Sequence, residues 1–333
     1  MTWKNRKVLV TGADGFIGSH LAEALAGRGA EVTALALYNA FDSHGWLDDV
    51  APEARAAMRL VRGDIRDPHQ MAALNRDQET VFHLAALIAI PHSYQAPSSY
   101  VQTNVQGTVN VLAAARDAGV ARVVHASTSE VYGTARFTPI TEDHPLHAQS
   151  PYSASKIGAD MMVESFVRSF ALPAVTLRPF NTYGPRQSER AVIGTVIRQA
   201  LDDRCESLSL GSLSPARDFS FVGDTVEAFI KVAELDGDHA GKVFNAGSGR
   251  MVAIGDMVEM VRRITGCDKP LVQEEQRLRP ADSEVMALQA DASSLGEATG
   301  WAPAVDLEGG LERTVEWWRG HVERVRSDVG YVV

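Results

Sequence analysis

The segment from Val8 to Gly18 constrains the fold of this chain more than any other. It begins with a short apolar run, Val8-Leu9-Val10, and continues into three glycines spaced G-x-x-G-x-x-G, at Gly12, Gly15 and Gly18. The apolar residues that follow have helical spacing. A glycine-rich turn between a strand and a helix lets a phosphate approach the free N–H groups at the helix N-terminus. The segment therefore predicts a phosphate-binding turn at the start of an α/β sheet.

Strand-like and helix-like segments alternate through the first half of the chain. The expected strands are residues 8–11, 31–37, 58–61, 81–84, 122–127 and 174–178, and the expected helices are 19–27, 101–118 and 152–170. Such alternation predicts a parallel sheet with helices on both faces. The predicted fold class is α/β, a Rossmann-like doubly wound parallel sheet with a smaller C-terminal substrate-binding region.

The pattern changes after about residue 180, where proline, glycine and arginine separate shorter segments. Helices are expected at 192–201, 223–235, 254–265 and 307–326, with a late strand at 243–246 that rejoins the sheet. We therefore expect 1–180 to form the dinucleotide-binding Rossmann domain, with about 218–252 returning to it. Residues 181–217 and 253–330 are expected to form the substrate-binding region.

Composition excludes several classes of partner. The 333 residues carry a formal net charge of -10, which argues against nucleic acid or an anionic membrane as the main partner. No uninterrupted apolar stretch approaches the length of a bilayer span. The two cysteines, Cys205 and Cys267, are expected to be free thiols in a reducing cytoplasm. The histidines do not have metal-ligand spacing, so no metal site is expected.

Tyr152 and Lys156 form the clearest catalytic pattern. They are four residues apart on a predicted helix and therefore lie on one face. A nearby cation favours a phenolate, so the pKa of Tyr152 is expected to fall and the residue to act as a base toward a substrate hydroxyl. Thr128, Ser129 and Glu130 follow the strand 122–127, at the sheet edge where ligands bind. Their hydroxyls and carboxylate are expected to face the substrate.

These motifs resemble the extended short-chain dehydrogenase/reductase family of sugar-nucleotide enzymes. Further matches are Gly63-Asp64-Ile65, His83-Leu84-Ala85-Ala86, Asn104-Val105 with Gly107-Thr108, Arg178-Pro179-Phe180-Asn181 and Arg217-Asp218-Phe219. The resemblance implies that Tyr152 is the base and that Lys156 binds the nicotinamide ribose. It also implies that Asp64 meets the adenine and that Asn181 and Arg217 hold the substrate diphosphate. Arg279 resembles a second nucleotide-binding arginine.

Residue patterns and resemblance together predict three sets of site residues. The catalytic set is Thr128, Ser129, Glu130, Tyr152 and Lys156. The cofactor-binding set is Gly12, Gly15, Phe16, Ile17, Gly18, Asn39, Asp64, Ile65, Leu84, Ala85, Ala86, Asn104, Tyr152, Lys156 and Pro179. The substrate-binding set is Thr128, Asn181, Arg186, Arg217 and Arg279.

The expected cofactor is NAD. The second predicted strand ends Ala36-Leu37-Tyr38-Asn39, without the acidic residue that usually contacts the adenosine ribose. The extra phosphate of NADP calls for an arginine here, but residues 38–49 contain no lysine or arginine. Asp14, inside the glycine turn, would repel that phosphate.

The sugar-nucleotide enzymes that this chain resembles catalyse three reactions on one scaffold, and the carboxylate of Glu130 distinguishes among these reactions. A nucleotide-sugar 4-epimerase does not need it, whereas a 4,6-dehydratase must remove the C5 proton. The UDP-glucuronate decarboxylases also often carry Ser-Glu here, but usually have a Tyr-Asp-Glu-Gly-Lys type sequence where this chain has Tyr152-Ser153-Ala154-Ser155-Lys156. Ser129 stands where the dTDP-glucose dehydratases have an aspartate. In this respect the chain is similar to the GDP-mannose dehydratases, in which glutamate acts without that aspartate.

The strongest overall resemblance is to the 4,6-dehydratases of legionaminic-acid-type pathways, which act on a nucleotide-linked N-acetylglucosamine. It extends over residues 37–41, 45–48, 85–91 and 183–187. The prediction is therefore a 4,6-dehydratase acting on a nucleotide-diphosphate hexose, with the 4-epimerase and the decarboxylase as alternatives. The resemblance also implies a homodimer that pairs the helices 101–118 and 152–170.

Overall fold

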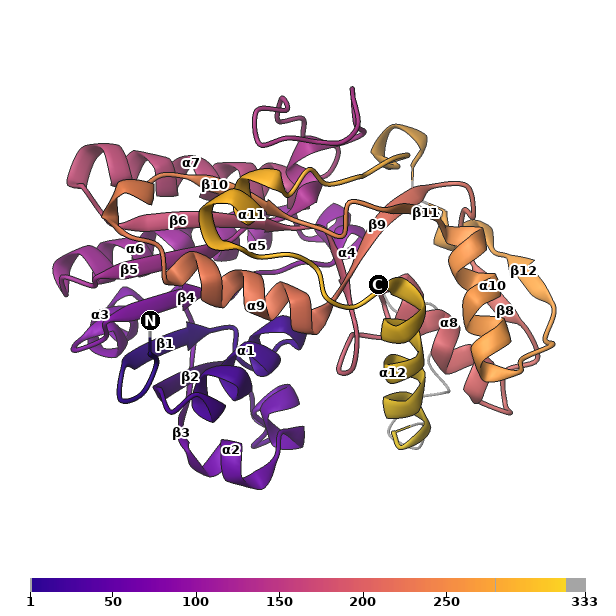
Figure 1. The fold of residues 1–333 in the computed structure, drawn as a ribbon, viewed down its shortest axis with the longest axis horizontal. Coiled ribbons are helices and arrows are strands. Elements are labelled where there is room, and N and C mark those ends of the chain that lie inside the picture. Colours follow the sequence, from indigo (N-terminus) through magenta and orange to yellow (C-terminus); the bar gives the residue numbers. More distant parts are fainter. Residues whose placement is uncertain (1, 279, 322–333) are drawn as a thin grey trace.

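The main element of the fold is a seven-stranded parallel sheet (Figure 1). The computed structural model describes residues 2–278 and 280–321. Its strand order is β10-β6-β5-β4-β1-β2-β3. The strands are β1 (Lys7–Thr11), β2 (Glu31–Leu37), β3 (Met58–Gly63), β4 (Thr80–His83), β5 (Arg122–Ala126), β6 (Ala174–Pro179) and β10 (Val243–Ala246). The order reverses between β1 and β4, and the C-terminal ends of strands at such a switch point form a ligand-binding crevice. The predicted Rossmann-like α/β fold is confirmed.

Helices cover both faces of this sheet. One face packs against α1 (Phe16–Gly27) and α9 (Val222–Ala233), and the other against α3 (Pro68–Asn75), α6 (Gly107–Asp117) and α7 (Pro151–Phe170). Strand β1 shows why: Val8 and Val10 are buried toward the first face and Leu9 toward the second. A parallel sheet buried on both faces requires such continuous apolar strands.

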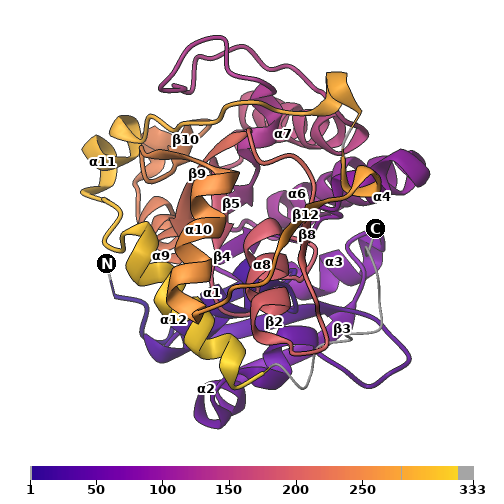
Figure 2. The same cartoon turned by 90° about the vertical axis from the view of Figure 1, so that its right-hand side faces the viewer.

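The C-terminal region is built from smaller pieces. A three-stranded sheet joins β7 (Asn181–Tyr183), β9 (Ala216–Phe221) and β11 (Met251–Ala253), and a two-stranded sheet joins β8 (Leu208–Leu210) and β12 (Leu271–Gln273). Three amphipathic helices, α8 (Val192–Leu201), α10 (Ile254–Thr265) and α12 (Leu307–Arg319), pack on them around a separate core, as the turned view shows (Figure 2).

The remaining elements are short. The α-helices among them are α2 (Pro52–Ala56), α4 (Ile90–Gln95), α5 (Pro97–Tyr100) and α11 (Ser293–Thr299). The 3₁₀ turns are η1 (Gly45–Asp49), η3 (Ser129–Tyr132), η4 (Gly237–His239), η5 (Glu275–Arg277) and η6 (Ala281–Ser283), and η2 (Val101–Gln106) is a π-helical turn that leads into α6.

Most of the elements expected from the sequence are present, but some helices differ. The expected helix 101–118 divides into the π-helical turn η2 and the shorter helix α6, which ends at Asp117. Helix α1 begins at Phe16, before the expected residue 19, so its N-terminus directly follows the glycine turn. Helix α12 ends at Arg319, and residues 322–326 of its expected range lie outside the described residues. The late strand β10 rejoins the main sheet beside β6 as predicted. Within the segment expected to return, α9 and β10 do so, whereas β9 and β11 belong to the small sheet.

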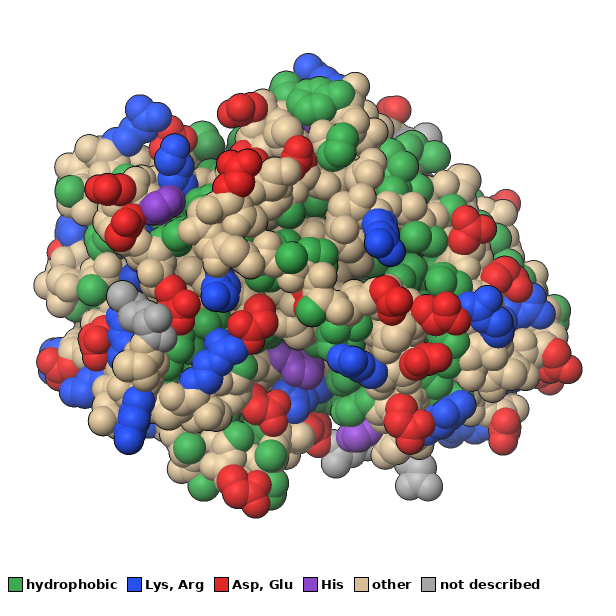
Figure 3. Space-filling model, in the orientation of Figure 1, with side chains coloured by type: hydrophobic (Ala, Val, Ile, Leu, Met, Phe, Trp, Pro, Cys, Tyr) green, Lys and Arg blue, Asp and Glu red, His purple; other side chains and the backbone are tan. Residues whose placement is uncertain are grey.

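The surface carries charges of both signs. Acidic and basic side chains are interspersed over the face seen in Figure 3, and pairs such as Arg6 with Glu79 and Arg263 with Glu308 join segments far apart in the sequence. Cys205 and Cys267 are free thiols, as predicted. Over the described residues, no helix is both long and apolar enough to span a bilayer.

Candidate active site

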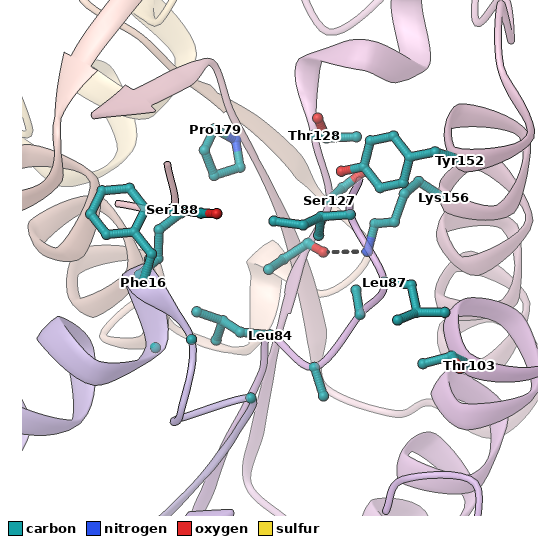
Figure 4. A pocket seen from close by; sticks show the side chains of 18 of the residues that line it. Phe16, Leu84, Leu87, Thr103, Ser127, Thr128, Tyr152, Lys156, Pro179 and Ser188 are labelled. Atoms are coloured by element: carbon teal, nitrogen blue, oxygen red, sulfur yellow. Dashed lines mark hydrogen bonds between the residues drawn. The ribbon is translucent and has the colours of Figure 1, made fainter. Parts of the chain in front are cut away.

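A cavity of about 740 Å³ lies at the C-terminal edge of the main sheet. Its lining comes from the β1–α1 turn, from the end of β2, from the segments that follow β3, β4, β5 and β6, and from the N-terminal turns of α7. Residues 187, 188 and 191, just before α8, line the remaining side. Tyr152 and Lys156 face Phe16 and Ser188 across the cavity (Figure 4). The cavity therefore occupies the crevice that the strand order predicts.

The glycine turn is shaped for a phosphate group. Gly12 has φ +69°, and a Cβ there would lie 2.7 Å from Ala85 N; a Cβ at Gly18 would lie 2.1 Å from Gly12 O. Neither position accepts a side chain. Gly15 caps α1 without a side-chain hydrogen bond, so the first N–H groups of the helix are available to an anion. The turn therefore fits the pyrophosphate of a dinucleotide.

Helix α7 presents the predicted catalytic pair. Its N-terminus is fixed by a capping box between Ser150 and Ser153 and by Pro151 in the first turn. Tyr152 and Lys156 are both buried, and both line the cavity. Lys156 Nζ donates to Ala126 O at 2.7 Å, and Thr128 lies beside the Tyr152 phenol (Figure 4).

The expected lowering of the Tyr152 pKa is wrong for the protein alone. Burial raises the pKa of Tyr152, and the negative charge of Glu130 raises it further, while the hydrogen bond with Thr128 lowers it. Burial also lowers the pKa of Lys156, to about 8, although Asp160 opposes that effect. The sequence showed the spacing of the pair but not how far the surrounding protein removes both groups from water.

A network of buried side chains surrounds Asp160, which lies one helical turn beyond Lys156 on α7. Asp160 Oδ2 accepts from Ser127 Oγ at 2.9 Å and from Arg178 Nη2 at 3.0 Å, and Asp160 Oδ1 lies 3.3 Å from His125 Nε2. Burial opposes ionisation of Asp160, but His125 and Arg178 outweigh it, so the pKa of Asp160 is lowered. Burial lowers the pKa of His125 to about 4. Asp160 and Arg178 therefore form a buried ion pair, and His125 is neutral near pH 7.

The segment after β5 brings hydroxyls and a carboxylate to the tyrosine. Thr128 is the N-cap of η3, and its hydroxyl accepts from Glu130 N at 3.2 Å. Thr128, Ser129 and Glu130 all line the cavity, as does Tyr152. All five predicted catalytic residues therefore lie together at one cavity.

Most of the predicted cofactor-binding residues also line the cavity, and two have other positions. Asn104 is buried behind the lining and holds residue 87 through both its backbone N–H and its carbonyl, at 2.8 and 2.9 Å. Asn39 accepts from Phe41 N and donates to Ser43 O, so it shapes its own loop. The predicted cofactor residues in the lining are Gly12, Gly15, Phe16, Ile17, Gly18, Asp64, Ile65, Leu84, Ala85, Ala86, Tyr152, Lys156 and Pro179.

The predicted substrate-binding residues are more dispersed. Thr128 and Asn181 line the cavity. Arg217, on β9, pairs with Glu284 at 3.1 Å, and Arg186 pairs with Glu23 of α1 at 2.7 Å; neither is among the lining residues. Arg279 lies outside the described residues.

Sequence reasoning missed several residues of the lining. Thr103, Ser127, Gln187 and Ser188 line the cavity, and so does His92. These residues come from loops and helix starts whose convergence is not visible in any local spacing. Asp160 had a detectable signal, because it lies one helical turn beyond Lys156 on the same face of α7. Over the described residues, no cluster of three potential metal ligands is present.

The sheet, the glycine turn and the Tyr152–Lys156 pair define a dinucleotide-dependent enzyme of the extended short-chain dehydrogenase/reductase class. The family model described as GDP-mannose 4,6 dehydratase matches residues 9–314. The chain belongs to this family of NAD-dependent sugar-nucleotide dehydratases and epimerases.

Relatives and solved structures in this family carry out two different reactions. A dTDP-glucose 4,6-dehydratase of Streptomyces griseus is 36% identical, with 94% of each chain covered. The structure of DesIV, a dTDP-glucose 4,6-dehydratase of Streptomyces venezuelae with NAD and TYD bound, has a TM-score of 0.85 at 31% identity and covers 96% of this chain and 99% of its own. A UDP-N-acetylglucosamine 4-epimerase of Methanobrevibacter ruminantium M1, in complex with UDP-N-acetylmuramic acid, has a TM-score of 0.85 at 30% identity, with coverage of 96% and 99%.

Proposed function

We propose that this protein is an NAD-dependent 4,6-dehydratase of nucleotide-diphosphate hexoses. The observation that carries the proposal is the carboxylate of Glu130 in the same cavity lining as Tyr152. Oxidation at C4 needs only one base, which Tyr152 supplies. Removal of the C5 proton needs a second one, and a carboxylate is suited to abstract a proton made acidic by an adjacent ketone. Glu130 therefore favours dehydration over epimerisation.

The residues of this chain divide the proton transfers between two groups. Gly12, Gly15 and Lys156 would hold NAD, which would supply a hydride acceptor for C4 and a hydride donor for C6 of the sugar. Tyr152 takes the O4 proton, and Thr128 hydrogen-bonds its phenol. Glu130 removes the C5 proton and delivers it to the C6 hydroxyl, which leaves as water. As the hydride reaches C6, Glu130 delivers a proton from solvent back to C5, and Tyr152 releases the O4 proton to solvent. The product is a 4-keto-6-deoxy sugar, and the cofactor is not consumed.

The sugar we propose carries an N-acetyl group, as in N-acetylglucosamine. The segment after β4 places three apolar side chains, Leu87, Ile88 and Ile90, in the cavity lining, beside His92 and Thr103. An apolar surface with a few polar groups suits an acetamido substituent, because the methyl group can be buried while the amide is hydrogen-bonded. The epimerase of Methanobrevibacter ruminantium M1 supports an N-acetylated sugar on this scaffold.

A 4-epimerase is the second candidate, favoured by the fold likeness to that epimerase. It would use Tyr152 and Lys156 in the same way but would return hydride to C4. Glu130 would then have no proton to transfer. The UDP-glucuronate decarboxylase remains the third candidate. The three reactions give products of different mass and are therefore directly distinguishable.

Mass spectrometry after incubation with a panel of UDP-, dTDP- and GDP-hexoses tests the proposal. The wild-type protein should form a product lighter than its substrate by one water. Glu130→Gln should lower this rate by about 10²–10⁴-fold. The variant should still oxidise C4, which is detected by the absorbance of reduced nicotinamide.

Glu53→Gln, on the exposed helix α2, is the control and should leave product formation unchanged. An isomer of unchanged mass would overturn the dehydratase in favour of the epimerase. Loss of carbon dioxide from UDP-glucuronate would favour the decarboxylase.

A further inference from the structure

Strand β2 ends without the acid expected at a ribose site. In Rossmann folds an acidic residue near the end of this strand usually accepts a hydrogen bond from the 2′-hydroxyl of the adenosine ribose. Here the strand ends at Leu37, and Tyr38 and Asn39 follow it. Asn39 directs its side chain into its own loop, as described above.

The carboxylate of Asp14 occupies this end of β2 from another direction. Asp14 belongs to the glycine turn, and its Oδ2 accepts from Leu37 N at 3.1 Å, across a separation of 23 residues. Asp14, Leu37 and Gly63 all line the cavity, and Gly63 is the β3 partner of Leu37. The carboxylate therefore lies at the strand end where the ribose acid is usually found.

The surrounding loop holds Asp14 in place. Trp46 N donates to Asp14 O at 3.0 Å, and Gly45, with φ +58°, is so close that a Cβ would lie 2.9 Å from Asp14 Cβ. Burial raises the pKa of Asp14 and outweighs the Leu37 amide and the neighbouring His44, which lower it. The Leu37 N–H can only donate, so the Asp14 oxygen that it contacts is an acceptor, and an ionised Asp14 would offer only acceptors to a ribose hydroxyl.

The nearby arginines are engaged with other carboxylates. Arg62 Nη2, on β3, lies 2.6 Å from Asp42 Oδ1, and Arg66 Nη2 lies 2.5 Å from Asp64 Oδ2. A 2′-phosphate at the end of β2 would therefore meet the Asp14 carboxylate beside cations that already have acidic partners. Repulsion between the phosphate and the Asp14 carboxylate therefore disfavours binding of NADP.

We propose that Asp14 accepts a hydrogen bond from the adenosine ribose 2′-hydroxyl of NAD and thereby excludes NADP. The proposal rests on the proposed cofactor and not on the proposed reaction, so it holds for a dehydratase and for an epimerase alike. It assigns to the glycine turn a selectivity that Rossmann proteins usually place after β2.

Isothermal titration of the nucleotide-free full-length protein with NAD⁺ and NADP⁺ tests this role. The wild type should bind NAD⁺ at least about 100-fold more tightly, since both a charge-assisted hydrogen bond and a repulsion contribute. Asp14→Asn keeps an acceptor for Leu37 N but removes the charge. It should reduce the NAD⁺/NADP⁺ affinity ratio by about tenfold or more. Glu31→Gln, at the opposite end of β2 and about 20 Å away, removes the same charge and should leave the ratio unchanged.

A second measurement changes the ligand in place of the protein. A 2′-deoxy form of NAD⁺ that lacks only the 2′-hydroxyl of the adenosine ribose should bind the wild type about tenfold more weakly than NAD⁺. This arm applies even if Asp14→Asn does not fold. An unchanged affinity ratio in folded Asp14→Asn, or equal wild-type affinities for NAD⁺ and its 2′-deoxy form, would overturn the role of Asp14. Absence of binding by either dinucleotide would instead contradict the proposed cofactor.

Discussion

The buried charged residues that join α7 to β6 and those of the C-terminal region are arranged in different ways. Asp160 and Arg178 are fully surrounded by protein and pair within the Rossmann domain, 3.0 Å apart. Arg217 pairs with a carboxylate from a distant segment, Glu284, and is set on the small sheet. The first group is assembled by the folding of one domain. In the second, Arg217 is already paired with Glu284. If Arg217 holds the substrate diphosphate, as the sequence predicts, a phosphate must compete with Glu284 for this guanidinium. On that prediction the catalytic side is preorganised, and the substrate side depends on exchange of ion pairs.

The buried pair gives the largest expected effect, which is on stability. Asp160→Asn leaves the Arg178 guanidinium buried without its counter-charge, and breaking a buried pair in this way costs about 3–5 kcal/mol. Urea unfolding should show this loss in the free energy of unfolding. Asp117→Asn removes an exposed partner of Arg116 and should change stability by less than about 0.5 kcal/mol. A loss below 1 kcal/mol in Asp160→Asn would show that the network is not essential to the preorganised side.

The buried ammonium of Lys156 gives a smaller effect that depends on pH. Its pKa is about 8 in the folded protein and 10.5 when exposed, so the folded state disfavours the charge. Between these pH values the unfolded chain binds more protons, and stability from this group rises with pH. Relative to Lys156→Met, the free energy of unfolding of the wild type should increase by up to about 3 kcal/mol between pH 8 and 10.5.

Urea unfolding at several pH values, on both proteins, measures this difference and cancels the groups that they share. The methionine variant lacks the titrating amine but keeps a side chain of similar length. Parallel pH profiles for the two proteins would contradict the assignment of a lowered pKa to Lys156.

The contrast between local and long-range contacts explains what could be predicted from the sequence. The glycine turn and the Tyr152–Lys156 pair are local patterns, and both were located correctly at the cavity. The contact between Asp14 and the end of β2 depends on the way two strands lie side by side. The pairing of Arg217 with Glu284 spans 67 residues. The expected pKa of Tyr152 failed for a related reason, because spacing along a helix carries no information about burial.

The ion pair of the C-terminal region gives the smallest expected effect, on ligand affinity. Glu284 shares Arg217 with any phosphate that approaches it, so removal of its charge should favour phosphate binding. Glu284→Gln should tighten binding of the preferred nucleoside diphosphate, among UDP, dTDP and GDP, by about fivefold, which corresponds to about 1 kcal/mol. Arg217→Gln should weaken it by more than that. Fluorescence titration measures both, and Glu308→Gln, which breaks an exposed pair with Arg263, should have no effect. Weaker binding in Glu284→Gln would mean that Glu284 positions the arginine for the ligand, and the substrate side would then be as preorganised as the catalytic one.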